Sequence, residues 1–278
     1  MSLSLPEKPR ILIESIESGV KLDLDELWAY RELLYFLTWR DIKVRYKQTF
    51  MGAAWVIIQP LLTMILFTVF FNKFVGVKSG NIPYPLFAYA GLLLWTFHSS
   101  GIINSATSLV SNTNLITKVY FPRMFIPAAA ISAGLLDLAI ASVVLLGLGL
   151  YYGIGLKSSM AILPVFIVLA TLLALAVGLL ASALTVRYRD LRHALPFLIQ
   201  FWLFASPVIY PSAIVPEKWR WILLINPFAG IVEGFRAALV GAGFDWFAIA
   251  ISAGVTLALL AVSIYFFRRA EDSFADLI

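Results

Sequence analysis

Five long apolar stretches constrain this chain more than any other feature of its sequence. They span residues 52–74, 84–110, 125–152, 161–186 and 246–267. A helix needs about 20 mostly apolar residues to cross the hydrocarbon core of a bilayer, so each stretch is long enough to do so. A sixth stretch, 194–210, is shorter, but it carries no charge and ends at Pro211. The sequence therefore predicts an all-α membrane protein with six transmembrane helices.

Two further segments have apolar residues at helical spacing but too many charges or breaks to cross a membrane. In residues 24–48 an apolar stripe lies among charged residues and is formed by Leu27, Tyr30, Leu34 and Leu37. This pattern is typical of an amphipathic helix that lies in the membrane interface. Residues 216–243 consist of two short apolar pieces separated by Asn226-Pro227. Pieces of that length predict re-entrant or interfacial helices between the last two spans.

Lys and Arg residues are distributed unevenly between the connecting segments, and this asymmetry predicts the orientation. If the N-terminus is cytoplasmic and six helices cross, 15 of the 21 Lys and Arg residues lie on the cytoplasmic side. No short apolar core with a small-residue cleavage site precedes the first span, which argues against a secretory signal. We therefore expect a cytoplasmic arm at 1–51, a transmembrane domain at 52–267 and a cytoplasmic tail at 268–278.

Several kinds of catalytic and cofactor chemistry are missing from the sequence. There is no Cys, and His98 and His193 are the two histidines, so thiol chemistry and a His-based metal cage are excluded. A nucleotide-binding P-loop needs Gly-Lys followed by Ser or Thr, and the dipeptide Gly-Lys does not occur. We expect no catalytic, cofactor or metal site on this chain, and ATP could drive it only from a separate subunit.

Asp137 and His98 are the candidate functional ionisable residues inside the predicted spans, where such groups are costly and often functional. Asp137 is either a proton or ion site or a carboxylate that bonds a neighbouring helix, and the absence of an obvious partner favours the second interpretation. His98 begins a polar stripe that continues through Ser100, Asn104, Thr107, Ser108 and Ser111. This face must look at protein or water. Helix packing and the lining of a translocation path explain it equally well.

Aromatic side chains recur on single helical faces within two of the spans. One set comprises Phe67, Phe70, Phe71 and Phe74, and the other comprises Phe197, Phe201, Trp202 and Phe204. Aromatic rings can stack against sugar C–H surfaces without holding one specific hydroxyl, which would suit a long polymer that slides. Packing against lipid or other helices is the more common role of any single Phe, so both interpretations stay open.

The short connection 112–123 between the second and third spans carries apolar residues, which we expect to be exposed, beside Lys118. These residues are Leu115, Ile116, Val119 and Tyr120. Pro122 then restarts the next helix. We interpret the connection as a small amphipathic knob at the membrane surface on which a partner could dock. The alternative is a connector whose Lys snorkels between two spans.

Four ordered segments resemble the ABC-2 type permeases, in particular those that export polysaccharides such as O-antigen, capsule and teichoic acid. The segments are RDIKVRYKQTFMGAAWVIIQPLL, KVYFPRMFIP, RYRDLRHALPFLIQFWLFASPVIYP and NPFAGIVEGFR, which begin at Arg40, Lys118, Arg187 and Asn226. The likeness extends over nearly the whole chain, from the amphipathic arm to the C-terminus. The tract 197–210 favours the polysaccharide branch over the drug-exporting branch.

The resemblance implies the permease subunit of an ATP-driven exporter in the bacterial inner membrane. It would move a lipid-linked polysaccharide, most simply O-antigen, through a channel formed by two copies of the chain. Two copies of an ATPase subunit would hold MgATP. Membrane lipids are further expected partners, and nucleic acid is not.

The resemblance also implies roles for particular residues. Coupling to the ATPase would use Asn114, Leu115, Ile116, Lys118, Val119 and Tyr120. An outer gate would include Asn226, Pro227, Glu233 and Arg236. The channel implied by the resemblance fits the aromatic and polar stripes, so its candidate lining is Phe67, Phe70, Phe71, His98, Ser100, Asn104, Phe197, Phe201, Trp202 and Phe204.

Three alternatives stay open at this point. An ABC-2 exporter of drugs or lipids would use the aromatic residues to line a hydrophobic cavity. An ion-coupled secondary carrier would use Asp137, but inverted repeats are expected in such carriers and none is visible in the sequence. A membrane-embedded enzyme such as a glycosyltransferase would need clustered carboxylates or basic residues at a membrane face. The acidic residues concentrate instead in the N-terminal arm and the C-terminal tail.

Overall fold

The computed structural model describes residues 24–47, 52–77, 79–80, 82–155, 157–271 and 274. Every regular element among these residues is helical, which confirms the predicted all-α fold. The α-helices are α1 (Leu24–Ala29), α2 (Arg31–Lys47), α3 (Gly52–Phe67), α4 (Tyr84–Ser111), α5 (Thr113–Lys118), α6 (Phe125–Tyr151), α7 (Leu163–Arg187), α8 (Leu191–Ala205), α9 (Arg220–Ile225), α10 (Pro227–Val240) and α11 (Trp246–Glu271). A π-helical segment, Thr68–Phe74, continues α3, and 3-10 turns lie at Ser158–Ile162, Ser212–Ile214 and Glu217–Trp219.

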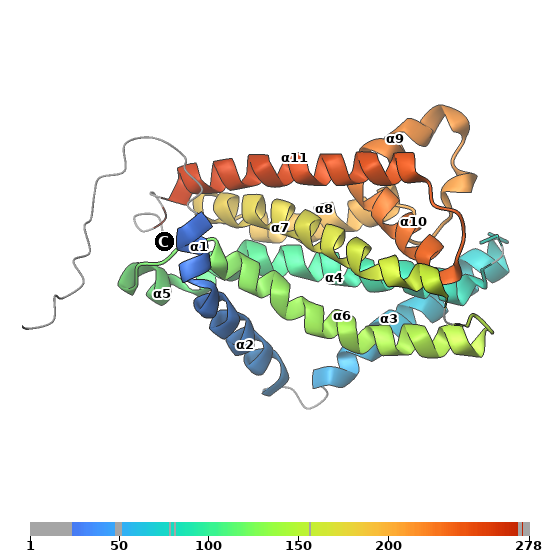
Figure 1. Cartoon of the computed structure of the whole chain (residues 1–278), viewed down its shortest axis with the longest axis horizontal. Coiled ribbons are helices and arrows are strands. Elements are labelled where there is room, and N and C mark those ends of the chain that lie inside the picture. The colour runs from blue at the N-terminus through green and yellow to red at the C-terminus, as the bar shows by residue number, and fades with distance from the viewer. Residues whose placement is uncertain are drawn as a thin grey trace, which may run out of the picture.

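Four long helices, α4, α6, α7 and α11, run side by side and form the body of the molecule (Figure 1). α4 lies at the centre, because 78% of its most apolar window is buried, compared with 11% in the first span and 17% in α11. α4 and α7 approach closely at Gly178, where a Cβ atom would stand 2.6 Å from the Ser105 Oγ atom. The outer helices therefore present apolar side chains to the membrane or to another protein.

The bundle has two ends that carry different elements (Figure 1). We call the α5 end the one that holds α5 and the last turns of α7 and α11. The α10 end holds α9, α10 and the start of α11. α2 and α11 meet at the α5 end, where Leu37 of α2 and Phe267 of α11 share one buried cluster.

Among the described residues, five helices are long and apolar enough to cross a membrane. They are Ala54–Phe74, Tyr84–Ser111, Phe125–Tyr151, Ser158–Arg187 and Trp246–Glu271. α8 has 15 residues, which makes it only about 22 Å long. It nevertheless brings the chain back along the bundle. α7 and α11 both end at the α5 end, whereas α11 begins at the α10 end, so the segment between them must run from one end to the other. α8 and the residues that follow it correspond to the sixth predicted span, and their crossing of the membrane stays a prediction.

The predicted span 194–210 differs from the helix that forms there. The helix covers Leu191–Ala205, and the residues after it are a buried turn. Pro207 explains the early end, because the residue before a proline disfavours the α conformation and the ring provides no N–H. The short helices predicted in 216–243 are present as Glu217–Ile225 and Pro227–Val240. They are bent by 96°, as in a re-entrant loop or a broken span.

The N-terminal arm packs on the bundle through one side of α2. Leu37 is buried, and neighbouring apolar residues pack against the same cluster. α2 also exposes Tyr35 and Phe36, and α1 exposes Trp28. Because the exposed side chains are also aromatic, the amphipathic character of this helix stays a prediction. The helix breaks at Tyr30, and its predicted place in the membrane interface stays a prediction. Residues 1–23 and the Leu27 side chain lie outside the described part of the chain.

Candidate functional site

The connection between the second and third spans forms a short helix and an exposed tip at the α5 end (Figure 1). We call residues 113–120 the α5 knob. Tyr120 is 78% exposed and Val119 is 52% exposed, as expected. Ile116 was expected to be exposed as well, but it faces inward with 4% of its surface exposed, because it packs into the core. The other predicted coupling residues are exposed or half-buried, and they are Asn114, Leu115 and Lys118. The segment therefore has the two-sided character of a docking element, and its contact with an ATPase stays a prediction.

The base of the α5 knob is fixed to other elements. Ile116 belongs to the buried cluster that contains Leu37 of α2 and Phe267 of α11. The backbone N–H of Arg123 donates to the Glu271 carboxylate at 2.8 Å, and the Arg123 guanidinium donates to the Glu271 carbonyl oxygen. A force on the exposed side of the knob would therefore reach both the arm and the last span through packed contacts.

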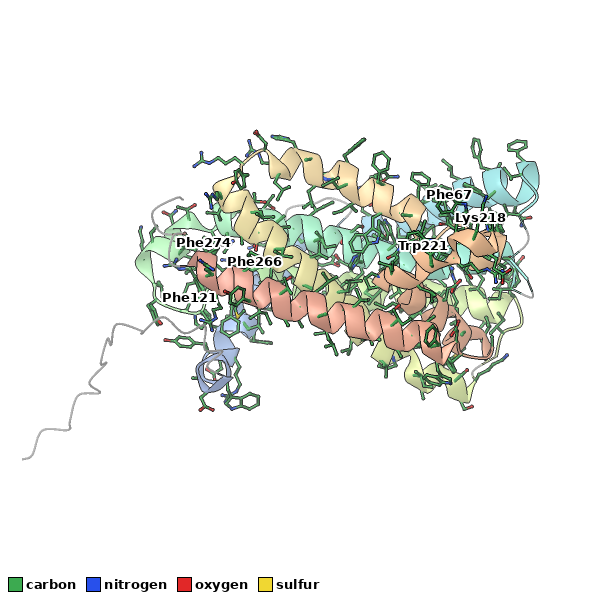
Figure 2. The ribbon with its side chains drawn as sticks, turned by 90° about the horizontal axis from the view of Figure 1, so that it is seen from above. Phe67, Phe121, Lys218, Trp221, Phe266 and Phe274 are labelled. Atoms are coloured by element: carbon green, nitrogen blue, oxygen red, sulfur yellow. The ribbon has the colours of Figure 1, made fainter. Side chains whose placement is uncertain are left out.

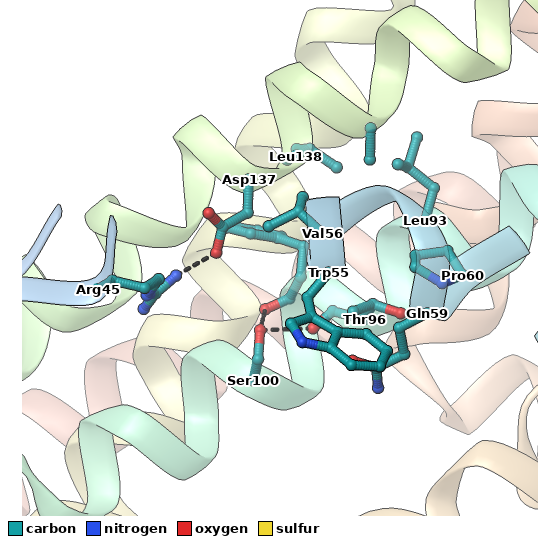
Figure 3. Close-up of a pocket in the computed structure, with 12 residues that line it drawn as sticks. Arg45, Trp55, Val56, Gln59, Pro60, Leu93, Thr96, Ser100, Asp137 and Leu138 are labelled. Atoms are coloured by element: carbon teal, nitrogen blue, oxygen red, sulfur yellow. Dashed lines mark hydrogen bonds and ion pairs between the residues drawn. The ribbon is translucent and has the colours of Figure 1, made fainter. Parts of the chain in front are cut away.

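A cavity of about 280 Å³ lies where the arm meets the bundle, between α2, α3, α4 and α6 (Figure 3). Its walls are mainly apolar, and Trp55 adds an indole ring that is 53% exposed. The polar side chains that line it are Arg45, Gln59, Thr96, Ser100 and Asp137. Ser100 is a predicted channel residue, and its hydroxyl donates to the Thr96 carbonyl oxygen at 2.6 Å. The cavity can accommodate a small group with both an apolar and a hydrogen-bonding side.

Asp137 has partners that the sequence did not reveal. Its carboxylate accepts hydrogen bonds from the Arg45 guanidinium and the Tyr46 hydroxyl, both on α2. The expectation of an acid without an obvious partner is therefore wrong. Burial and the hydrogen bond to Asp137 raise the pKa of the Tyr46 hydroxyl, so it remains a donor at neutral pH. Asp137 thus joins the arm to α6 as a structural ion pair, which is the second of its two sequence-based interpretations.

Replacing Asp137 with Ala is expected to loosen the arm from the bundle. The side chains of Arg45 and Asp137 are 29% and 21% exposed, so their loss should cost about 1–3 kcal/mol, between the values for exposed and fully buried pairs. The measurement is thermal unfolding in detergent, together with the rate of proteolysis within the arm. The double variant R45D/D137R should regain part of the stability because it restores opposite charges.

Asp41→Ala is the matched control for this experiment. Asp41 pairs with Arg40 at 2.8 Å on the same helix, so this ion pair joins no two elements. The control should unfold like the original protein. If Asp41→Ala and Asp137→Ala lowered stability equally, or if R45D/D137R were no better than the single variants, a structural link between α2 and α6 would be refuted.

The predicted channel residues form two groups in the structure, and the first group is on the surface. Its clearly exposed aromatic members, each 52–65% exposed, are Phe70, Phe197, Phe201 and Phe204. The Phe197 and Phe201 rings meet edge to face with their centroids 4.7 Å apart. α8 shows this side because its other side packs into the bundle through Leu195, Ile199 and Leu203. Asn104 is also exposed, whereas Phe67 and Phe71 are half-buried. The exposed side chains are available to a second copy, a polymer or lipid.

His98 and Trp202 form the second group, which lies inside the chain. His98 has no exposed surface, and its ring centroid is 4.9 Å from those of Trp202 and Phe228. The Trp202 Nε1–H donates to the Asn226 side-chain oxygen at 3.0 Å. Two predicted channel residues thus meet a predicted gate residue in one packed cluster. In this conformation His98 packs against other side chains and faces no passage.

Asn226 fixes the bend between α9 and α10. Its side-chain oxygen accepts from the Phe228 N–H at 3.1 Å and so caps α10. Its amide nitrogen donates to the Ser206 hydroxyl at 2.8 Å and to the Ala205 carbonyl at 3.2 Å. Pro227 occupies the first helical position, where its missing N–H removes no bond. A single side chain therefore connects the end of α8 to the start of α10.

Arg236 on α10 is 4% exposed and clamps three segments together. Its guanidinium donates to the carbonyl oxygens of Phe87 at 3.1 Å and Pro207 at 2.6 Å, and to that of Val208. It also lies over the Phe87 ring, 3.6 Å from the ring centroid. The turn after α8 thereby obtains donors for carbonyls that water would not reach in a bilayer. Glu233, one turn earlier, is half-buried. An outer-gate role for this region stays a prediction.

Arg45 and Tyr46 were not predicted from the sequence as partners of Asp137. A usable signal existed, because an acid inside a span requires a partner. The arm preceding the first span provides the cation, but 92 residues separate Arg45 from Asp137. Their proximity depends on how α2 crosses α6, which no local pattern specifies.

Comparison with known proteins agrees with this architecture. A family model described as ABC-2 type transporter matches residues 32–240. The chain is 30% identical to the O-antigen export system permease protein RfbA of Myxococcus xanthus, over 91% of this chain and 98% of that protein. It is 28% identical to RfbA of Klebsiella pneumoniae, over 89% and 95%. It is 23% identical to the polysialic acid transport protein KpsM of Escherichia coli, over 84% and 92%. The chain therefore belongs to the ABC-2 type transporter family.

Proposed function

We propose that this chain is the permease subunit of an ATP-driven exporter that carries a lipid-linked polysaccharide of the O-antigen type across the bacterial inner membrane. The observation that carries the proposal is the similarity to RfbA of Myxococcus xanthus, which extends over 98% of that protein. That protein and the Klebsiella relative are named for O-antigen export, and KpsM is named for polysialic acid transport.

The surface of the chain is compatible with a channel between two copies. The first span is only 11% buried in its apolar window, and α8 exposes a row of Phe side chains. Apolar surfaces of this extent are covered by lipid or by another protein. Stacking on aromatic rings would let a sugar polymer move past without fixed hydrogen bonds.

ATP would act through a separate subunit bound at the α5 end. The chain contains no Gly-Lys and hence no P-loop. The α5 knob offers exposed apolar and charged side chains on a base that is packed against the arm and the last span. Two ATPase subunits with MgATP would then drive two permease subunits, with the α5 end in the cytoplasm.

Export of a surface glycan tests this proposal. Cells that synthesise the polymer but lack its exporter should display it when they receive this chain together with an ATPase that co-purifies with it. Cells that receive this chain without the ATPase should display no polymer on their surface. The measurement is surface glycan by antibody labelling, with vanadate-sensitive ATP hydrolysis of the purified complex. Failure of any ATPase to co-purify, or transport of small hydrophobic compounds without glycan, would contradict the proposal.

The double variant F197A/F201A should lower glycan export about tenfold, because two stacking surfaces of about 0.5–1.5 kcal/mol each are removed. Assembly with the ATPase should not change, since both side chains are exposed. F247A/Y265A is the matched control, because Phe247 and Tyr265 are exposed aromatic residues on another span, α11. Equal export by F197A/F201A and the original chain would show that α8 does not line the translocation path.

A further inference from the structure

A second cavity, of about 670 Å³, lies between the last turns of α7 and α11 at the α5 end. α7 contributes Leu184 and Arg187 to its wall, and α11 contributes Phe266 and Arg269. Phe274 closes one side and is 1% exposed. Figure 2 shows Phe266 and Phe274 close together at this end of α11. We call this space the α7–α11 cavity, and it is separate from the cavity beside Asp137.

The two helices line the α7–α11 cavity in the same way. On each helix an apolar side chain, Leu184 or Phe266, is followed three residues later by Arg187 or Arg269, so each pair lies on one helical face. Leu184 is 44% exposed and Phe266 is 53% exposed, so the apolar wall opens to the surroundings. The cavity thus has an apolar wall and a cationic rim.

Among the described residues, no carboxylate pairs with the two guanidinium groups of the rim. Within the described part of the chain, neither Arg187 nor Arg269 has a carboxylate oxygen within 4.0 Å, whereas neighbouring Arg268 approaches Glu271 at 3.5 Å. Arg187 lies 5.6 Å from the centroid of the Tyr188 ring, which holds it beside an exposed aromatic side chain. The rim therefore offers two donor groups to an anion.

The positions of Arg187 and Arg269 along their helices indicate which kind of anion they would bind. α11 has 26 residues, which corresponds to about 39 Å, longer than the roughly 30 Å hydrocarbon core. Arg269 is in its last turn, and Arg187 is the last residue of α7. With α7 and α11 crossing the bilayer, both guanidinium groups would reach the head-group layer, while Leu184 and Phe266 would lie nearer the acyl chains. Arg forms strong paired hydrogen bonds with phosphate oxygens.

We propose that the α7–α11 cavity binds an anionic membrane phospholipid. Its phosphate lies between Arg187 and Arg269, and the first carbons of its acyl chains lie along Leu184 and Phe266. Basic pockets between membrane helices have the charge that such head groups require. A soluble phosphate would leave the apolar wall uncovered, so the lipid uses both features of the cavity.

Native mass spectrometry of the full-length chain purified in detergent tests this assignment. The probes are phosphatidylglycerol, the zwitterionic phosphatidylethanolamine, undecaprenyl phosphate and soluble glycerol 3-phosphate. The chain should retain phosphatidylglycerol in preference to the other three. R187Q/R269Q should reduce this retention about tenfold, since two favourable contacts with the anionic head group are lost. R189Q/R192Q, which removes two exposed charges from the same end outside the cavity, should retain the lipid.

Thermal unfolding without added lipid shows whether the variants are folded. Equal unfolding temperatures for R187Q/R269Q and R189Q/R192Q, with lipid loss in the first alone, would support the site. Equal loss in both variants, or no preference over phosphatidylethanolamine, would refute it. Effective competition by glycerol 3-phosphate would assign the rim to free phosphate. Stronger retention of undecaprenyl phosphate would assign the cavity to a prenyl carrier, and either result overturns the proposal.

Discussion

Replacing Arg236 with Leu is expected to lower the free energy of unfolding by about 3–5 kcal/mol, because each buried carbonyl oxygen that loses its donor costs about 1–3 kcal/mol. The carbonyl oxygens of Phe87, Pro207 and Val208 would lose the donor that Arg236 provides. In a bilayer no water could replace it. The unfolding temperature should fall by about 10 °C. The measurement heats the detergent-solubilised protein and determines the remaining folded fraction by size-exclusion chromatography. Arg236→Lys should be intermediate, because an ammonium lacks the planar fork of donors.

A second substitution tests the same clamp from the other side. At Gly91 a Cβ atom would stand 2.7 Å from the Val208 carbonyl oxygen and would clash with the Arg236 guanidinium. Helix propensity alone predicts that Gly91→Ala stabilises the helix by about 1 kcal/mol. The clamp predicts the opposite sign, a loss of stability. Gly147→Ala is the control, because nothing lies within 4 Å of its Cβ position in α6.

Arg220→Leu provides the control for charge removal, since Arg220 is an exposed arginine at the α10 end. It should unfold at the original temperature. If Arg236→Leu did the same, or if Gly91→Ala and Gly147→Ala were both stabilising, the clamp would not hold α4, α10 and the turn after α8 together.

Reversing the charge of Lys118 and removing the ring of Tyr120, in K118E/Y120S, should reduce ATP-driven export about tenfold or more, as expected when an interface loses central contacts. Both side chains are exposed in the single chain, so folding should be unaffected. The measurement is glycan export together with the stimulation of ATPase activity by the permease. Both should fall while the unfolding temperature stays constant.

K218E/Y151S is the matched control for the α5 knob. Lys218 and Tyr151 are exposed, and they lie in Glu217–Trp219 and at the end of α6, far from the knob (Figure 1). This variant changes the same residue types and should keep ATPase coupling. Ile116→Ser should lower both stability and coupling, because Ile116 anchors the knob in the core. Unchanged export by K118E/Y120S would mean that the ATPase acts on another part of the chain and not on the α5 knob.

The sequence by itself determined the class of fold and the positions of most elements. Hydropathy and length identified the five long spans, and the dipeptide Asn226-Pro227 marked the bend between α9 and α10. The short apolar connection 112–123 identified the α5 knob, although the inward position of Ile116 became clear only from the structure. These features are local: the length of an apolar run, a proline or a short amphipathic segment decides them within a few residues.

The tertiary structure decided which side chains meet. It paired Asp137 with Arg45, turned His98 and Trp202 inward while Phe197 and Phe201 face outward, and placed Arg236 on three carbonyl groups. It also brought Arg187 and Arg269 to one cavity. Every face of a membrane helix is largely apolar, so hydropathy does not distinguish the side that meets protein from the side that meets lipid. That distinction follows from how distant helices pack, which a local pattern does not contain.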